Sequence, residues 1–341
     1  MNEEQQLIVE TAKRIFVDQC AKSVVDAAEA GEFPSGLWNT LEETGLTLAG
    51  IDLEAGGSGG AMADALLLVR EAGAAAAPIP LAEHLISATL LAAKNITIPK
   101  GIITLALVSS DQDTSGKLAG RLRGKVHQVT YSEVAQSVLW VTAHGLVLTP
   151  NVDIPWSRTV GISGESWASL DLDLTPIQGE LVPFLDAGQL ARQLGAATRI
   201  NLMSGAISRV LEMSVQYVSD RVQFGRPLAK FQAIQHQLAI LAGEAAACQR
   251  CADAVLTANN QLDIAIGKAR TGEAVTLVSD ISHQVHGAIG YTLEHALNLR
   301  TRRLWQWRDE YGTEREWQIL IGKQFCKTGA DSLWAEITGA G

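Results

Sequence analysis

The sequence of 341 residues is poor in aromatic residues and in cysteine, and each shortage excludes a class of protein. Phe, Trp and Tyr together make up 5% of the chain, and there are 4 cysteines. So few cysteines cannot form a disulfide-stabilised scaffold at this length. No run of about 18 apolar residues is present, so we expect no transmembrane helix. The N-terminal segment is polar and acidic, unlike a secretory signal, and we therefore expect a cytoplasmic protein.

Positive charge is also scarce. The chain has 27 Lys and Arg residues against 37 Asp and Glu residues, which gives a net charge of −10. This balance argues against a nucleic-acid-binding protein, which needs a basic surface. Hydrophobic residues make up 47% of the chain and charged residues only 19%, which excludes a disordered protein. Small residues are abundant, with 31 Gly and many Ala, as in closely packed helices and in surfaces shared between subunits.

Hydrophobic periodicity divides the chain into three zones. Apolar residues recur at helical spacing in residues 1–97, where one predicted helix ends at Gly45. Residues 98–185 contain short β-branched runs bounded by Gly, Ser and Asp, which predict about six strands. Residues 186–341 return to the helical pattern and predict four or five long helices. We therefore expect a mainly α fold with a small central β domain, and these three zones as its domains.

Two short patterns resemble metal or redox motifs. Cys248 and Cys251 form C-x-x-C, but they lie inside an Ala-rich helical stretch without a second ligand pair. We interpret them as thiols that pack between helices. His283 and His286 are three residues apart and can share one helix face. They have no acidic partner at metal-ligand spacing, so we expect no metal site.

Residues 220–239 form the first segment with a candidate binding function; they read DRVQFGRPLAKFQAIQHQLA. Arg221 precedes a predicted Phe-Gly turn, and Pro227 lies near the start of the following helix. An Arg, a Gln and the amides of a helix start are typical of a phosphate or pyrophosphate site. From the spacing alone, an ordinary helix corner with a solvated Arg is the favoured interpretation.

Residues 283–317 form the second segment. Gln284, Gly287 and Gly290 indicate a helix end and a tight turn, where the backbone can approach a ligand closely. A basic cluster follows on the next predicted helix. We interpret it as a solvated or subunit-facing helix surface rather than as an anion site. The cluster consists of Arg300, Arg302, Arg303 and Arg308.

Together these segments resemble the acyl-CoA dehydrogenase family. The family's C-terminal domain carries R-x-Q-F-G-x-P-L-x-x-F-Q and, further downstream, Q-x-x-G-x-x-G-Y-T, and both occur here. The N-terminal passage LWNTLEETGLTLAGIDLEAGGSGG is also similar to the family's. The resemblance implies an N-terminal helical domain, a β-barrel-like domain and a C-terminal four-helix bundle. It also implies an FAD cofactor and an acyl-CoA substrate.

The resemblance implies particular contacts for the distal half of FAD, in a site shared across a dimer. Arg221 would bind the pyrophosphate, with Gln223 and Phe224 beside it. A guanidinium fork matches phosphate geometry. Gln284 would contact the adenine-side phosphates or ribose. The remaining residues that the resemblance places in the cofactor site are Gly287, Ala288 and Thr313.

The catalytic base of the family is missing from both of its usual positions. In most members it is the Glu of I-Y-E-G-T, and Tyr311 occupies that position here. A phenol with an ordinary pKa of about 10 is a poor base near neutral pH. Other members carry the Glu on the helix before R-x-Q-F-G, at a position corresponding to Gly195. Glu310 is adjacent to the usual position, although a shift of one residue redirects a side chain.

The β domain also departs from the family. Members carry T-E-P-x-x-G-S-D, whose hydroxyls and amides hold the flavin ring. The comparable region here has hydroxyl residues without that pattern, and the chain is shorter in this zone. The half of the site that holds the flavin ring is therefore degraded, whereas Arg221 and Gln284 are retained. The hydroxyl residues are Ser109, Ser110, Thr114 and Ser115.

One interpretation explains both the retained and the missing features. The chain would be the subunit without a catalytic Glu in a heterotetrameric acyl-CoA dehydrogenase. A homologous partner would supply the Glu base and the flavin-ring site, and electrons would pass to an acceptor flavoprotein. Such paired enzymes act on steroid side-chain CoA esters, which we take as an analogy only. Two alternatives remain: a homomeric dehydrogenase with Glu310 as base, and a non-enzymatic scaffold that has lost the cofactor.

Overall fold

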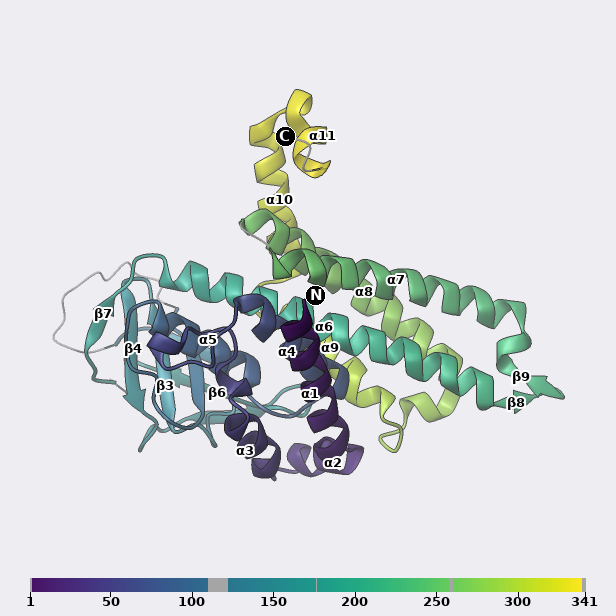
Figure 1. Cartoon of the computed structure of the whole chain (residues 1–341), viewed down its shortest axis with the longest axis horizontal. Coiled ribbons are helices and arrows are strands. Elements are labelled where there is room, and N and C mark those ends of the chain that lie inside the picture. The colour runs from purple at the N-terminus through teal and green to yellow at the C-terminus, as the bar shows by residue number, and fades with distance from the viewer. Residues whose placement is uncertain (1, 110–121, 176, 258–259, 339–341) are drawn as a thin grey trace.

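The computed structural model describes residues 2–109, 122–175, 177–257 and 260–338 (Figure 1). The regular elements between residues 3 and 92 are all helices. The first helix begins at Asn2, whose side chain accepts a hydrogen bond from the Gln5 backbone, while the Gln5 side chain accepts one from the Asn2 backbone. These helices are α1 (Glu3–Gln19), α2 (Lys22–Glu29), α3 (Ser35–Glu43), η1 (Leu46–Leu48), η2 (Leu53–Ala55), α4 (Met62–Ala75) and α5 (Leu81–Ala92).

The predicted end of α3 at Gly45 is confirmed, since Gly45 has a left-handed φ of 73° directly after the helix. Strands follow between Ile103 and Pro183, and seven are described here rather than the six we expected. Two further strands, β8 and β9, form a hairpin later in the chain. The seven strands are β1 (Ile103–Leu107), β2 (Lys125–Thr130), β3 (Ser137–Thr142), β4 (Gly145–Pro150), β5 (Ser157–Val160), β6 (Ser166–Asp171) and β7 (Leu181–Pro183).

The seven strands form two sheets. One has the order β1-β3-β4-β7, with β1 parallel to β3, and the other has the order β2-β6-β5 and is antiparallel. Trp140 is fully buried in this region, where its ring stacks on Trp156 and its indole N–H donates to Thr149 Oγ1. A buried indole with its N–H satisfied contributes a large apolar contact without an unpaired donor.

A single long helix connects the sheets to the far end of the molecule. α6 (Ala187–Asp220) has 34 residues and runs from the sheets to the hairpin formed by β8 and β9, as Figure 1 shows. The next two helices, α7 and α8, pack along it. The elements after α6 are β8 (Val222–Gln223), β9 (Arg226–Pro227), η3 (Leu228–Lys230), α7 (Gln232–Leu256), α8 (Gln261–His286), η4 (Gly287–Tyr291), α9 (Leu297–Asp309), α10 (Glu314–Thr328) and α11 (Ala330–Thr338).

Six α-helices are thus described after the sheets, against the four or five long ones expected, and the last of them has 9 residues. α10 and α11 project from the helical body in Figure 1. Within the described ranges, no helix is long and apolar enough to cross a membrane. Cys248 lies buried inside α7 and Cys251 is a free thiol in the same helix, which agrees with packing thiols.

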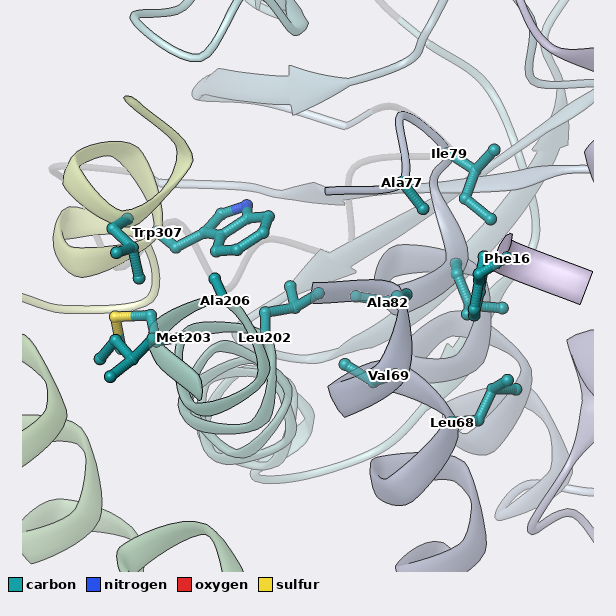
Figure 2. Packing of buried hydrophobic residues seen from close by; sticks show 14 of the residues in the cluster. Phe16, Leu68, Val69, Ala77, Ile79, Ala82, Leu202, Met203, Ala206 and Trp307 are labelled. Carbon is teal, nitrogen blue, oxygen red and sulfur yellow. The ribbon is translucent and has the colours of Figure 1, made fainter. Parts of the chain in front are cut away.

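The main core forms where α4, α5 and α9 meet α6 (Figure 2). Leu202 and Met203 of α6 are buried there with Trp307 of α9. Small residues bring α4 and α6 into backbone contact, because a Cβ atom on Gly205 would lie 1.9 Å from the Arg70 carbonyl oxygen. This close approach explains the excess of Gly and Ala in the sequence, since larger side chains would force the two helices apart.

Candidate functional site

The first predicted segment forms an exposed hairpin at the end of α6. The chain leaves the helix at Arg221 and turns at Phe224 and Gly225, which have left-handed φ values of 54° and 77°. Arg221 and Gln223 are exposed, and Phe224 is 90% exposed. The guanidinium of Arg226 lies 4.2 Å from the centre of the Phe231 ring, which anchors the base of the hairpin. The side chains of the motif are therefore available to a group outside this chain.

The second predicted segment is a turn at the end of α8, as expected. The helix ends at His286, and Gly287 follows with a φ of 64°. Gln284, Gly287 and Ala288 are exposed. A Cβ atom on Gly287 would meet nothing within 4 Å, so the backbone faces open space. This geometry allows a ligand to approach the backbone closely.

The two segments lie at the same end of the helical body. Tyr217, one turn before Arg221, stacks on His286, with 4.6 Å between the ring centres. His286 also bonds to the Ser282 carbonyl through Nδ1, and His283 bonds to Thr301 Oγ1 through Nε2. Both histidines therefore take part in the packing between the helix ends. Among the described residues, no three His, Cys, Asp or Glu side chains come together as a metal site requires.

Thr313 lies elsewhere, at the start of α10, where it caps the helix. Its backbone N–H and its hydroxyl both donate to Glu316 Oε2, at 2.8 and 3.1 Å. The bond from the Thr313 backbone is the main reason that the pKa of Glu316 is lowered. The Thr313 hydroxyl proton is therefore already used within the chain.

Gly195 and Tyr311, the two positions that we expect to correspond to the family's base, are in contact here. A Cβ atom on Gly195 would lie 2.1 Å from Tyr311 Cδ1, so the phenol ring lies directly against the backbone of α6. The Arg199 guanidinium sits 4.9 Å from the centre of the same ring. Burial, with a further contribution from Glu83, raises the pKa of Tyr311 above its ordinary value. The phenol therefore stays protonated at neutral pH and cannot accept a proton from a substrate.

Glu310 is buried beside Tyr311 and is held by an ion pair. It is 6% exposed, and it accepts hydrogen bonds from Arg199 Nε at 2.5 Å and from Gln306 Nε2 at 3.1 Å. Burial raises its pKa to about 7, although Arg199 opposes the shift. One face of Glu310 borders a cavity of about 80 Å³, together with Glu83 and Arg199.

A buried cation outside the predicted set organises this region. Arg199 of α6 also bonds to Glu83 of α5, so one guanidinium joins two buried carboxylates from different segments. Lys268 of α8 donates to the carbonyls of Arg308 and Gly312, which fixes the loop that carries Glu310 and Tyr311. Charged residues inside otherwise apolar helical runs are the sequence signal that would have found Glu83, Arg199 and Lys268.

The interpretation of the α9 arginines as a solvated surface is wrong for Arg300 and Arg303. Arg303 is 0% exposed, lies 3.0 Å from Glu29 Oε1 and 3.6 Å from Glu165, and Arg300 is 9% exposed. α9 packs into the core, and its basic side chains reach carboxylates and carbonyls of the N-terminal helices and the sheets. Helical periodicity cannot distinguish such a helix from a solvated one, because its partners are distant in sequence.

The space beside the two base positions is small. The cavity next to Glu310 has about 80 Å³, and a second cavity beyond Glu83 and Arg199 has about 20 Å³. Ligand pockets for organic molecules usually measure about 300 to 1,000 Å³. The region therefore has room for water and not for an acyl group.

The hydroxyl residues of the region that we compared with the family's flavin-ring site are only partly described. Ser109 pairs with Lys125 and its hydroxyl donates to the Lys125 carbonyl, so it belongs to the sheet edge. Ser110, Thr114 and Ser115 lie outside the described residues. Arg221 and the Gly287 backbone, in contrast, have the exposure that a diphosphate requires: both are exposed at one end of the helical body, and the space beside Gly287 is open.

This architecture, helical at both ends with paired sheets between, is that of a known class of dehydrogenases. Two family models match the sequence: the acyl-CoA dehydrogenase N-terminal domain over residues 2–96 and the acyl-CoA dehydrogenase C-terminal domain over residues 191–309. The chain belongs to the acyl-CoA dehydrogenase family. The expected fold class, mainly α with a small β domain, is thereby confirmed.

Among curated relatives, the chain is 29% identical over 310 residues to acyl-CoA dehydrogenase IpdE2 of Mycobacterium tuberculosis. That alignment covers 88% of this chain and 91% of the relative. Among solved structures, a chain of the ChsE4-ChsE5 complex from Mycobacterium tuberculosis matches with a TM-score of 0.82 and 21% identity, covering 97% of this chain and 99% of that one. A chain of a Tcur3481-Tcur3483 steroid ACAD variant matches with a TM-score of 0.81 and 24% identity, covering 94% and 97%.

Proposed function

We propose that this chain is the subunit without a catalytic base in a heteromeric, FAD-dependent acyl-CoA dehydrogenase. The observation that carries the proposal is the contact between Tyr311 and Gly195. Both positions that hold the base in the family are occupied by residues that cannot take a proton, and the phenol ring fills the space between them. Glu310, the nearest carboxylate, is held by Arg199. The α proton of the acyl-CoA would therefore be removed by a Glu of the partner.

The role of this chain would be to hold the distal half of the cofactor. When bound, FAD supplies the acceptor for the hydride that leaves the β carbon of the acyl group. Arg221 and Gln223 would bind the pyrophosphate from the exposed hairpin, with Phe224 beside them. The turn after α8 would receive the adenine-side phosphates or ribose through Gln284 and the backbone of Gly287 and Ala288. We keep Thr313 in this proposed set, although its hydroxyl caps α10.

The partner would be a homologous dehydrogenase subunit, in a cytoplasmic heterotetramer with two copies of each chain. Two structures of similar fold are named as two-component assemblies, ChsE4-ChsE5 and Tcur3481-Tcur3483, and the second is named as a steroid enzyme. By analogy with that name, we propose a steroid side-chain CoA ester as the substrate and a flavoprotein as the electron acceptor. Apolar side chains exposed near the cofactor segments fit a subunit contact: Phe224, Ile289, Tyr291 and Leu293.

The test is co-expression of this chain with a dehydrogenase subunit that retains its Glu. We expect one FAD for each pair of subunits and acyl-CoA oxidation by the complex, whereas this chain alone is inactive. Arg221→Gln should lower the FAD content of the complex, measured from flavin absorbance after purification. Arg158→Gln is the matched control, because Arg158 is an exposed residue on β5. An unchanged FAD content in the Arg221 variant would favour a scaffold that has lost the cofactor.

A homomeric dehydrogenase with Glu310 as base is the second candidate. The observation in its favour is that the Glu310 pKa is raised to about 7 and that the residue borders a cavity. In that case the chain alone oxidises an acyl-CoA and Glu310→Gln abolishes the reaction. Turnover by the pure chain would contradict the heteromeric proposal.

A further inference from the structure

A cavity of about 500 Å³ is lined by no residue of the two cofactor segments or of the two base positions. It is bordered by α1, α4, α6, α7 and α9. We propose that this cavity binds a small organic oxyanion, with a phosphate or carboxylate head and a short apolar body. The argument rests on two guanidinium groups that line it, those of Arg70 and Arg300.

Arg300 is a buried cation without a carboxylate partner. It is 9% exposed, and no Asp or Glu oxygen of the described chain is within 4 Å of it. Its Nε and Nη1 donate to the carbonyls of Ala74 and Ala296, at 3.0 and 3.1 Å. Its Nη2 makes no hydrogen bond within the described ranges and is not fully buried, so this donor is open to solvent. The two carbonyls supply partial negative charge and Glu212 acts on the group from a longer distance, so its positive charge is only partly compensated.

Arg70 leaves a second donor unused on the same cavity. Its Nε donates to Asn201 Oδ1 at 3.1 Å and its Nη1 to Asp253 Oδ1 at 2.8 Å. Its Nη2 is buried and has no hydrogen-bond partner within the described ranges. A buried donor without an acceptor costs free energy, and an unpaired buried charge costs more. A ligand oxyanion in the cavity that accepts from Arg70 Nη2 would remove this cost, and Arg300 Nη2 offers a further donor on the same cavity.

The remaining walls define what kind of anion fits. The two acids on the cavity are already near cations: Glu212 pairs with Arg209 at 2.7 Å, and Glu71 lies 3.9 Å from Lys13. The apolar part of the wall comes from side chains of α1 and from the last turn of α4. A volume of 500 Å³ suits an organic molecule rather than a bare ion. The apolar wall consists of Phe16, Val17, Cys20, Ala74 and Ala75.

Calorimetric titration of the full chain with phenyl phosphate tests the site, with benzoate as the carboxylate counterpart. We expect saturable binding of at least one of them. Arg300→Gln should weaken it by about tenfold, the loss expected for one charge-assisted hydrogen bond. Arg158→Gln, on the distant strand β5, should leave the affinity unchanged. Absence of binding at millimolar concentration, or equal affinity in the Arg300 variant, would overturn the proposal.

A second pair of variants keeps the test valid if Arg300→Gln does not fold. Ser208 of α6 is half-buried on the wall of the cavity. Ser208→Glu places a carboxylate beside the two guanidinium groups, whereas Ser208→Gln adds the same volume without charge. We expect the Glu variant to melt at a higher temperature than the Gln variant and to bind no phenyl phosphate. Equal melting temperatures would contradict an unpaired cationic site.

A partner's side chain is the competing occupant. The titration is therefore repeated on the chain in complex with the dehydrogenase subunit. Binding that persists in the complex supports a small-molecule site. Binding to the free chain that disappears in the complex would assign the cavity to a partner's carboxylate and overturn the proposal. Neither result depends on which subunit carries the catalytic base.

Discussion

Tyr311 constrains more than its own position, because the phenol ring requires Gly195 opposite it. Any larger residue at position 195 would meet the ring, since even a Cβ atom there would lie 2.1 Å from Tyr311 Cδ1. The two residues therefore form one packing unit at the two positions where we expected the family's base. Beside them, buried Glu310 is stabilised by hydrogen bonds from Arg199 and Gln306.

The packing unit predicts an unfavourable effect of a single methyl group. Gly195→Ala should destabilise the chain by about 1–3 kcal/mol, the usual cost of overpacking. Gly243→Ala is the matched control, because Gly243 lies within α7 and a Cβ atom there would meet nothing within 4 Å. That variant should gain about 0.5–1 kcal/mol from helix propensity. Urea unfolding of both variants measures the difference, and equal stabilities would contradict the contact.

The raised pKa of Glu310 predicts a pH dependence of stability. The folded chain binds a proton at this carboxyl more tightly than the unfolded chain, with a pKa of about 7 against 4.5. The contribution of Glu310 to stability is therefore fully present below pH 4.5 and is lost as the pH rises toward 7. In Glu310→Gln this dependence should disappear. Unfolding free energies measured across this range, wild type minus variant, should fall with pH; a flat difference would contradict the shift.

At the scale of elements, the position of helix ends could be predicted and the partners of buried charges could not. Gly45 and Gly287 end helices where the sequence indicated, because a left-handed residue is a local requirement. The exposed Phe-Gly hairpin after Arg221 follows from the same kind of local signal. Arg199 joins α5 to α9, and Arg303 joins α9 to the end of α2. These pairs depend on the tertiary arrangement, which the periodicity of the sequence does not contain. For this reason we expected α9 to present a solvated or subunit-facing surface.

Arg199 is expected to contribute far more to the free energy of unfolding than an exposed arginine on the same helix. Arg199→Gln leaves Glu83 and Glu310 buried without a full countercharge, which should cost about 3–5 kcal/mol. Arg209→Gln, also on α6, removes a pair with Glu212 in which both side chains are at least half exposed, and should cost under about 1 kcal/mol. Denaturant unfolding of the two variants provides the comparison. Similar losses would show that the buried pairs contribute little.

At the scale of the whole molecule, the chain has one closed region and one open one. Beside the base positions the space is filled by Tyr311 and the ion pairs of Arg199, whereas the hairpin and the turn after α8 expose apolar side chains at the other end. Part of this division could be predicted, because the retained motifs and the missing base are visible in the sequence. The small size of the cavity beside Glu310 could not be predicted, since it depends on Glu83 of α5 and Arg199 of α6 meeting in the folded chain.

The open end predicts where a partner binds. Phe224→Asp should weaken association with the dehydrogenase subunit while leaving the fold intact, because the side chain is 90% exposed in the isolated chain. Leu174→Asp is the control, since Leu174 is 82% exposed but follows β6 in the sheet region. Sedimentation velocity of each mixture measures the complex. A stronger effect at Leu174 would place the contact on the sheets.

The bond between Arg303 and Glu29 spans 274 residues of sequence. A ribosome must therefore add 274 residues after Glu29 before the carboxylate at the end of α2 can meet this cation. Until then Glu29 stays hydrated, and the N-terminal helices cannot reach their final packing against α9. Such distant closure slows folding. The contacts between α9 and the end of α2 therefore belong to the last part of the fold that can be completed during synthesis.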